Sequence, residues 1–499
     1  MRFDPYFPCG IASIGTEMLE VIETRIGQRK IEIMRHSGLI KYRVLTSTAV
    51  FLFAFIAQSA AAADDYGIPA SKEQFEMRRD MVADKLNKAL LPAMRNHNID
   101  MWIVLDRENN NDPLHAELGG GFSGVRAAFV FFDNGSDTPE KIYYGSHTMP
   151  ANSVVAQVYD ETLYYGYSAE GLTPHLRKLV HARDPKRIGV NTSETLPEAD
   201  GLTVGLSDFL TDAIGDEYAR RIVSAELVVR DFRLNRTALE TAAYTDALNW
   251  TARWMQEALS SENVRTGKTT NEDIAWFLED RALELGLTSS ATTRVVREGE
   301  LLPVHDPHSP LEPGDIINID GGLHYLGFEV DIKRTAYILK PGETVMPEGL
   351  QAAWRDAQRM GALYASKMVP GAIGHEIWAS INADAAAQGY KAVGPDSGRA
   401  GNESPRAEIG VYGHSVGNEA HDIGTRVAAD LPFAYGERVR FPLQANEWVS
   451  IELHVNTPIP EWDGDTWYAR FEETAQMTED GIRWLIQNQE DVFLIEATE

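Results

Sequence analysis

The spacing of apolar and polar residues alternates along the chain between a helical and a strand-like pattern. In the helical stretches, apolar residues recur at helical intervals among charged residues, which predicts amphipathic helices. These stretches lie at about 72–98, 237–259, 270–287, 349–368 and 374–388. Short apolar runs without that spacing predict strands. The clearest runs are 100–105, 125–132, 448–456 and 468–477. The mixture predicts an α/β (α+β) protein.

The order of these stretches predicts two folded domains. Strand-like and helical stretches alternate up to about residue 225, which is typical of one α/β domain over 64–225. The segment Glu226–Asn235 then leads the chain into a second domain over 226–499, whose C-terminal part is rich in strands. Residues 1–63 do not share this pattern.

One stretch, residues 315–335, joins two apolar strands near Leu326-Gly327 and carries acidic residues within them. If the chain turns there, Asp320 lies diagonally across from Asp331 on one face, at roughly 7–8 Å between Cα atoms. Two converging carboxylates repel each other and hold a proton unless a cation neutralises them. Two divalent ions about 3.5–4 Å apart would do so and would supply hydrolytic chemistry. The alternative is an edge hairpin with its acidic residues in solvent.

Three later motifs each contribute one more metal-binding group. His414 follows a glycine, Glu452 lies in the apolar run Val449–Leu453, and Glu472 lies in a second strand-like run. A single histidine is more often structural than a ligand. A carboxylate in an apolar strand is harder to dismiss, because burying an unpaired charge costs several kcal/mol. Together with the hairpin, these residues form an oxygen-rich set that suits a pair of divalent ions.

These motifs, in this order, resemble those of the pita-bread metallopeptidases of family M24, in the branch of Xaa-Pro aminopeptidases, prolidases and creatinase. Asp320 and Asp331 keep the eleven-residue offset of that family, and compatible residues fill the other three ligand positions. The resemblance covers roughly 226–481, and the region before it is similar to the N-terminal domain of the same branch. It implies a creatinase-like α/β domain followed by a pita-bread catalytic domain.

The resemblance also implies a role for each ligand. Asp331 and Glu472 would bridge two divalent ions, Asp320 would bind one ion alone, and His414 with Glu452 would complete the other. Manganese is the first choice of metal, with zinc, cobalt or iron as alternatives that the same ligands accept. A hydroxide held between the ions would be the nucleophile.

Further residues would handle the proton and the substrate, again by resemblance. Glu452 would carry the proton from the water to the leaving amine, and His421 would contact the substrate and stabilise the oxyanion. A histidine before the hairpin should act similarly. His305 fits its apolar-proline context better than His308, although the loop to Asp320 is slightly shorter than in the family. The implied enzyme is a homodimeric metallo-aminopeptidase or dipeptidase that hydrolyses N-terminal Xaa-Pro bonds or Xaa-Pro dipeptides.

Departures from the family pattern bear on specificity. Ser415 replaces the glycine that usually follows the metal-binding histidine, and Leu453-His454 replace the usual Pro-Gly, with a loop expected from there to Trp467. These residues should border the substrate, so an alternative is a pita-bread hydrolase or lyase that acts on a non-proline small substrate. Arg470 is expected either to support a ligand carboxylate or to form a salt bridge at a strand edge.

Two other classes of protein compete with the metallopeptidase. Gly413-His-Ser-Val-Gly417 matches the Gly-x-Ser-x-Gly elbow of serine hydrolases, with Ser415 as nucleophile. That elbow needs a helix immediately after it, and the sequence of 418–425 is a poor helix former. A non-enzymatic binding protein on the same fold is the second competitor, and the retention of all five ligand types argues against it.

Composition and the N-terminal segment add predictions about partners and export. The formal net charge of −28 argues against a nucleic-acid-binding protein, which needs a basic face. Basic residues in 35–43, the apolar run 44–57 and the small residues after it predict a signal peptide cleaved after Ala63. The apolar run is shorter than the roughly 20 residues that span a bilayer, which favours a signal peptide over the alternative of an uncleaved membrane anchor.

A signal peptide begins near its basic region, so we expect Met34 to be the true start and 1–33 to be an over-extended reading frame. The mature protein is then expected to be periplasmic or secreted, without stable membrane insertion. Its partners would be a peptide or dipeptide substrate and a second copy of itself, and no nucleic acid.

Overall fold

The computed structural model describes residues 66–301, 308–392 and 408–497. Residues 66–499 form one compact unit, in which a first sheet is followed along the chain by two further sheets. The α/β prediction is confirmed, whereas the domain boundary near 225 stays a prediction. The expected start at Met34 and the expected signal peptide lie outside the described residues. Among the described residues, the helices are all too short or too polar to cross a membrane.

The first sheet has six strands in the order β4-β3-β2-β1-β5-β6. Their bounds are β1 Met101–Asp106, β2 Ala127–Phe132, β3 Glu140–Gly145, β4 Glu161–Tyr164, β5 Ile188–Val190 and β6 Ile222–Ser224. β2 runs antiparallel to both β1 and β3, and the other neighbours are parallel. A sheet of this kind needs apolar cover on both faces.

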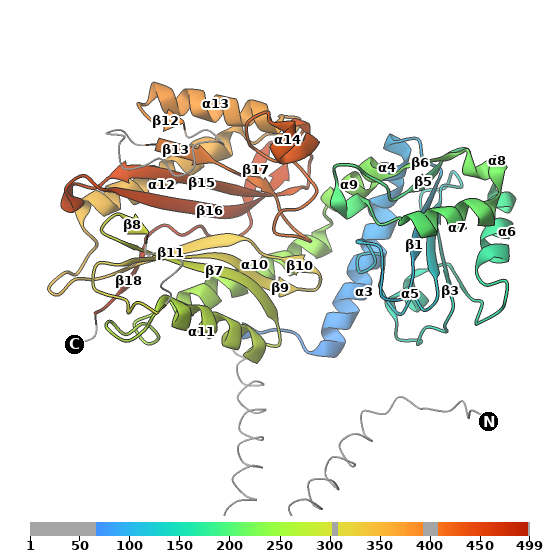
Figure 1. The fold of residues 1–499 in the computed structure, drawn as a ribbon, viewed down its shortest axis with the longest axis horizontal. Coiled ribbons are helices and arrows are strands. Elements are labelled where there is room, and N and C mark those ends of the chain that lie inside the picture. Colours follow the sequence, from blue (N-terminus) through green and yellow to red (C-terminus); the bar gives the residue numbers. More distant parts are fainter. Residues whose placement is uncertain (1–65, 302–307, 393–407, 498–499) are drawn as a thin grey trace, which may run out of the picture. The chain divides into compact units, whose positions relative to one another are not determined.

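Helices provide that cover, as Figure 1 shows for this part of the chain. Alternate residues of β1 enter two core clusters, because successive side chains of a strand point to opposite faces. The cluster on one face includes residues of α3 (Ser71–Lys88), α4 (Leu90–Asn96) and α9 (Glu226–Leu234). The cluster on the other face includes residues of α6 (Thr173–Arg183) and α7 (Val204–Ile214). The shorter α5 (Val154–Val158), η1 (Pro197–Ala199) and α8 (Asp216–Ala219) lie in the connections.

The other two sheets carry the candidate site. One has the order β18-β11-β9-β7-β8, with β10 paired to β9, and the other has the order β12-β13-β15-β16-β17, with β14 paired to β15. The first contains β7 Thr288–Arg297, β8 Glu300–Leu301, β9 Ile316–Tyr325, β10 Phe328–Glu329, β11 Ile332–Ile338 and β18 Phe493–Ile495. The second contains β12 Lys391–Ala392, β13 Glu408–Val411, β14 His414–Ser415, β15 Trp448–Pro458, β16 Thr466–Thr478 and β17 Gly481–Trp484.

The longer helices of this region pack against the two sheets. They are α10 Ala238–Ala258, α11 Asn271–Glu284, α12 Glu348–Lys367 and α13 Gly374–Ala387. α10 contacts β9 and α11 contacts β7, whereas α12 contacts β15 and β16 (Figure 1). β11 in turn contacts β16, so the two sheets meet where the candidate ligands lie. The short α14 (Pro432–Tyr435), η2 (Gly436–Arg440) and η3 (Pro460–Trp462) complete the region.

Most predicted elements are present, with two instructive differences. Thr270 caps α11 at the start of the helix predicted from residue 270, and it forms a capping box with Asp273. The helix predicted over 72–98 is interrupted at Ala89, between α3 and α4. The loop expected after Leu453 is much shorter than predicted, because β15 continues to Pro458 and pairs with β16 up to Thr466. His454 therefore belongs to a strand, where an uninterrupted ladder satisfies its backbone groups.

Candidate metal centre

The hairpin of β9 and β11 places two carboxylates on one face, as predicted. The chain turns at Leu326 and Gly327, which both have positive φ, 53° and 92°. Lys333 lies directly opposite Asp320 in the strand register, so Asp331, two residues earlier, is diagonal to Asp320. The glycine after Asp320 is required. Gly321 has a φ of 123°, and a Cβ there would lie 1.9 Å from the backbone oxygen of Ser290.

The second sheet brings three further groups to the same place. Glu452 on β15 lies directly opposite Glu472 on β16, and His414 on β14 lies opposite Ser450, two residues before Glu452. Side chains two residues apart on a strand share a face, so all three ligand candidates point the same way. Ser450 donates a hydrogen bond to Oε1 of Glu472 at 2.5 Å, which fixes that carboxylate.

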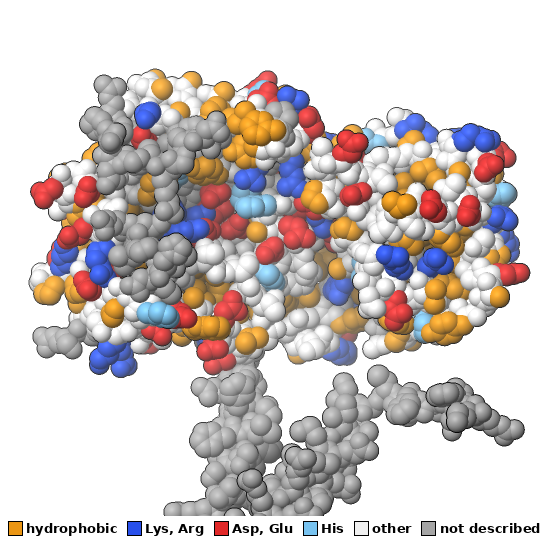
Figure 2. All heavy atoms as spheres, viewed as in Figure 1, with side chains coloured by type: hydrophobic (Ala, Val, Ile, Leu, Met, Phe, Trp, Pro, Cys, Tyr) orange, Lys and Arg blue, Asp and Glu red, His pale blue; other side chains and the backbone are white. Residues whose placement is uncertain are grey.

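The five predicted ligands converge in overlapping groups of three. Ligand atoms within 4.8 Å of one another join Asp320 with Asp331 and Glu472, and join His414 with Glu452 and Glu472. A third group joins Asp331 and His414 to His421. Asp331, His414 and Glu472 are buried. On the face shown in Figure 2, acidic and histidine side chains gather near the middle of the molecule.

His414 has the geometry of a metal ligand. Its Nδ1 lies 3.0 Å from the backbone oxygen of Ser415, an acceptor, so Nδ1 carries a hydrogen and Nε2 faces the carboxylates. Nε2 is buried without a hydrogen-bond partner of normal geometry. Its nearest carboxylate oxygens belong to Glu472 at 3.4 Å, Glu452 at 3.6 Å and Asp331 at 3.9 Å. A divalent ion among these atoms would give the buried nitrogen a partner.

The pKa values show that the cluster holds an excess of negative charge. Burial raises the pKa of Asp331 well above its ordinary value, and repulsion from Glu472 raises it further. Burial alone would lower the pKa of His414, but Glu452 and Glu472 outweigh it and raise that pKa to about 10. Burial also opposes ionisation of Glu452, but Lys333 and His414 outweigh it and hold its pKa well below the usual range. Protons or cations must therefore neutralise the site, and the donor set suits a divalent ion.

Two basic residues at the site were missed by the sequence analysis. Nζ of Lys333 lies 3.1 Å from Oδ1 of Asp320 and 2.8 Å from Oε1 of Glu452, and it also donates to Oε2 of Glu472. Arg294 on β7 donates to the other oxygen of Asp320 at 2.7 Å. Lys333 had a detectable signal, because it follows Asp331 by two residues on a strand and must share its face. Arg294 had none, because its position depends on the pairing of β7 with β9.

The histidines that were predicted to contact the substrate lie in different parts of the structure. His421 lies beside the cluster, with its ring edge-on to that of His414 at 4.4 Å between centroids. Burial and the neighbouring His414 lower the pKa of His421 to about 4, so its imidazole is neutral at neutral pH. His308 is exposed and pairs with Glu272 on α11 at 2.7 Å. His305, the preferred candidate, lies outside the described residues.

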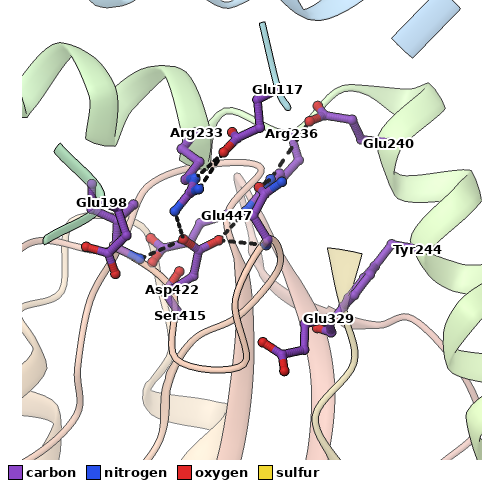
Figure 3. A network of polar contacts seen from close by, with 12 residues as sticks. Glu117, Glu198, Arg233, Arg236, Glu240, Tyr244, Glu329, Ser415, Asp422 and Glu447 are labelled. Atoms are coloured by element: carbon purple, nitrogen blue, oxygen red, sulfur yellow. Dashed lines mark hydrogen bonds and ion pairs between the residues drawn. The ribbon is translucent and has the colours of Figure 1, made fainter. Parts of the chain in front are cut away.

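A buried ion-pair network holds the segment that carries His421 (Figure 3). Asp422, the next residue, accepts hydrogen bonds from Arg233 at 3.1 Å and from Arg236 at 2.6 Å. Arg233, at the end of α9, also donates to Glu117 of the first sheet's connections at 2.8 Å. No pattern in the sequence indicated this network, because it joins residues 189 positions apart.

The residues that depart from the family pattern lie close to the site but do not form a serine triad. Ser415 is fully buried on the face of β14 opposite to His414. Within 408–497, the first helix after it is α14, which has four residues and begins at Pro432, so the required helix is missing. His454 is buried and stacks between Tyr412 and Tyr468, with Arg470 opposite it on β16. The guanidinium of Arg470 lies 5.2 Å from the Tyr468 ring centroid.

Comparisons with known proteins agree with this geometry. Among protein-family models, metallopeptidase family M24 matches residues 242–479. No curated protein sequence matches the chain. The X-Pro aminopeptidase from Thermotoga maritima MSB8 is similar in structure, with a TM-score of 0.58 and 19% identity, over 81% of this chain and 100% of that chain.

Two further solved structures show the same likeness. The Xaa-Pro dipeptidase from Bacillus anthracis has a TM-score of 0.55 and 16% identity, over 84% of this chain and 100% of that chain. Zinc-substituted E. coli aminopeptidase P in complex with product has a TM-score of 0.51 and 13% identity, over 84% and 95%. At these identities the structures establish the fold, which is the pita-bread fold expected from the motifs. Residues 242–479, the part of the chain that matches metallopeptidase family M24, contain all five convergent ligand candidates.

Proposed function

We propose that this protein is a metal-dependent exopeptidase that hydrolyses N-terminal Xaa-Pro bonds or Xaa-Pro dipeptides. The observation that carries the proposal is the convergence of Asp320, Asp331, His414, Glu452 and Glu472 in overlapping groups of three, whose ligand atoms lie within 4.8 Å of one another. The M24 match supports the metal dependence. The likeness to an X-Pro aminopeptidase and an Xaa-Pro dipeptidase supports the substrate class, although it shows only the fold.

The chain's own residues supply the acid–base chemistry and the substrate contacts. A bound divalent ion would polarise the scissile carbonyl and lower the pKa of an attacking water. Glu452 is the proposed proton carrier, because Lys333 holds its Oε1 while its Oε2 faces His414. His421 is neutral and borders the same cluster, so it can donate a hydrogen bond to a developing oxyanion.

A related substrate class is favoured by one observation. His454 stacks on Tyr468 at 3.7 Å between ring centroids and is buried two residues beyond Glu452. Leu453 and this stacked His454 stand where the family usually has Pro-Gly, so a non-proline small substrate is the second candidate. We further propose manganese as the native metal, and export after signal cleavage near Ala63.

One set of assays tests the function. The protein is stripped with chelator, reloaded with Mn²⁺, Zn²⁺, Co²⁺ or Fe²⁺, and incubated with Xaa-Pro and non-proline peptides of two to five residues. We expect hydrolysis only after reloading, and strongest for Xaa-Pro peptides. His414→Ala and Asp331→Ala should lose metal and activity together, with the circular dichroism spectrum retained. Full activity of either variant, or activity that survives exhaustive chelation, would refute the proposal.

A further inference from the structure

A lysine lies among the ligand carboxylates, in a place where the resemblance implies a metal ion. Lys333 is buried on β11, directly opposite Asp320 and two residues after Asp331. We propose that the Lys333 ammonium group takes the place of one of the two divalent ions, so that the site binds a single ion on the His414 side. This inference rests on the proposed metallopeptidase function and concerns the number of ions.

The contacts of Nζ are those of a fully engaged cation. An ammonium group has three N–H donors, and three carboxylates surround this one. Asp320 lies at 3.1 Å, Glu452 at 2.8 Å, and Glu472 accepts the third hydrogen bond. The same three carboxylates were expected to be distributed over both ions. Lys333 instead joins them through one compact, fixed charge.

Asp320 shows most directly which ion is replaced. The resemblance implies that Asp320 binds one of the two ions, and that His414 and Glu452 bind the other. Oδ1 of Asp320 faces Lys333 at 3.1 Å, and Oδ2 accepts a hydrogen bond from Arg294 at 2.7 Å. Both oxygens are therefore engaged by fixed cations, and a metal ion on this side would meet two positive groups at close range.

The donors that Lys333 leaves available lie around His414. Nε2 of His414 has no hydrogen-bond partner, and it faces Oε1 of Glu472 at 3.4 Å, Oε2 of Glu452 at 3.6 Å and Oδ2 of Asp331 at 3.9 Å. In Glu452 and Glu472 the oxygen that faces His414 is the one that does not contact Lys333. Each of these carboxylates can thus accept a hydrogen bond from the ammonium with one oxygen and bind a metal ion with the other.

The charges of the cluster lead to the same number of ions. Four carboxylates are present, and Lys333 and Arg294 offset two of their negative charges. The next buried pair, Arg334 with Glu473, neutralises itself. One divalent ion balances the remaining charge, whereas two would leave an excess of positive charge in a buried site. Uncompensated buried charge is strongly unfavourable.

Metal stoichiometry tests the inference without relying on activity. Wild type, Lys333→Thr and Lys333→Met are dialysed against Mn²⁺, and bound metal is measured by inductively coupled plasma mass spectrometry and calorimetric titration. Threonine suits the strand and removes the ammonium with most of its stem, and methionine keeps most of the stem while removing the ammonium. Lys141→Met is the matched control, because Lys141 is also a buried strand lysine beside a carboxylate, Asp160, but lies in the first sheet.

We expect one ion per chain in wild type and in Lys141→Met, and two in Lys333→Thr. Lys333→Met should also bind a second ion, more weakly. Electron paramagnetic resonance gives an independent readout, since wild type should show isolated Mn²⁺ and Lys333→Thr an exchange-coupled pair. The melting temperature of Lys333→Thr should also rise more on adding Mn²⁺ than that of wild type, because the ion replaces a lost buried charge.

Three results would overturn the inference, and they differ in what else they affect. Two ions per chain in wild type would show that Lys333 excludes no metal, while the metallopeptidase proposal would stand. No bound ion in wild type or in any Lys333 variant would reject both the single-ion site and the proposed function. One ion in wild type and still one in both Lys333 variants would show that Lys333 does not occupy an ion's place.

Discussion

Replacing Asp422 by asparagine tests whether a buried ion-pair network positions the substrate histidine. Asp422 is 1% exposed and lies between Arg233 and Arg236, which donate to it at 3.1 Å and 2.6 Å. Asparagine keeps the shape and part of the hydrogen bonding but removes the charge. Both arginines, which are also buried, then lose an ionic partner.

The expected cost follows from the burial of the pair. Removing one partner of a buried ion pair typically costs about 3–5 kcal/mol, because the other charge remains uncompensated. Arg233 keeps Glu117 as a partner, so we expect the lower part of that range. Burial raises the pKa of Asp422, but the two arginines outweigh it and hold that pKa below its ordinary value. The stabilisation is therefore present above the unfolded-state pKa near 4 and is lost as the pH falls below it.

Urea unfolding at pH 7 and pH 3 measures both effects. At pH 7 the Asp422→Asn protein should unfold at lower urea, and the difference from wild type should shrink at pH 3. Its kcat/KM should fall while its metal content is kept, because His421 precedes the altered residue but the five ligands are untouched. Asp184→Asn, at an exposed salt bridge, is the control and should change stability little. A loss below about 1 kcal/mol for Asp422→Asn would refute the reasoning.

Three other changes have defined outcomes. Gly413→Ala should weaken metal binding in calorimetric titration, because a Cβ there would lie 1.8 Å from the hydroxyl of Tyr364 and would displace the neighbouring His414. An unchanged affinity for the metal would contradict this prediction. Burial raises the pKa of Asp112 to about 7, so the folded state keeps a proton that the unfolded chain loses above about pH 4. Stability should thus fall between pH 4 and 7 by at most roughly 4 kcal/mol, and Asp112→Asn should lack that component in urea titrations. Thr237→Ala removes the cap of α10 and should lower the free energy of unfolding by about 1 kcal/mol, measured by thermal unfolding. An unchanged free energy of unfolding would show that the capping box does not contribute to stability.

Local patterns predicted most elements and the ligand candidates. The cap at Thr270, the helices over 238–258 and 348–367, and the turn at Leu326 follow from residues that are close in sequence. The diagonal placement of Asp320 and Asp331 follows from the same turn, because a hairpin's register is fixed by its loop. The break at Ala89 was not predicted, although Pro92 is a local signal for it, because proline lacks the N–H that would bond to the carbonyl of Lys88. The length of β15 was not predicted because it depends on pairing with β16.

The sequence by itself determined which residue types could bind metal, and that two of them share a hairpin face. Only the tertiary structure decided what surrounds them. Lys333 and Glu472 are 139 positions apart, and they meet because β11 packs on β16. Arg294 reaches Asp320 through the pairing of β7 with β9, and Asp422 is held by arginines of α9. Periodicity and turns are local properties of the chain, whereas the charge balance of a buried site depends on every element that closes around it. The number of ions proposed here follows from that charge balance.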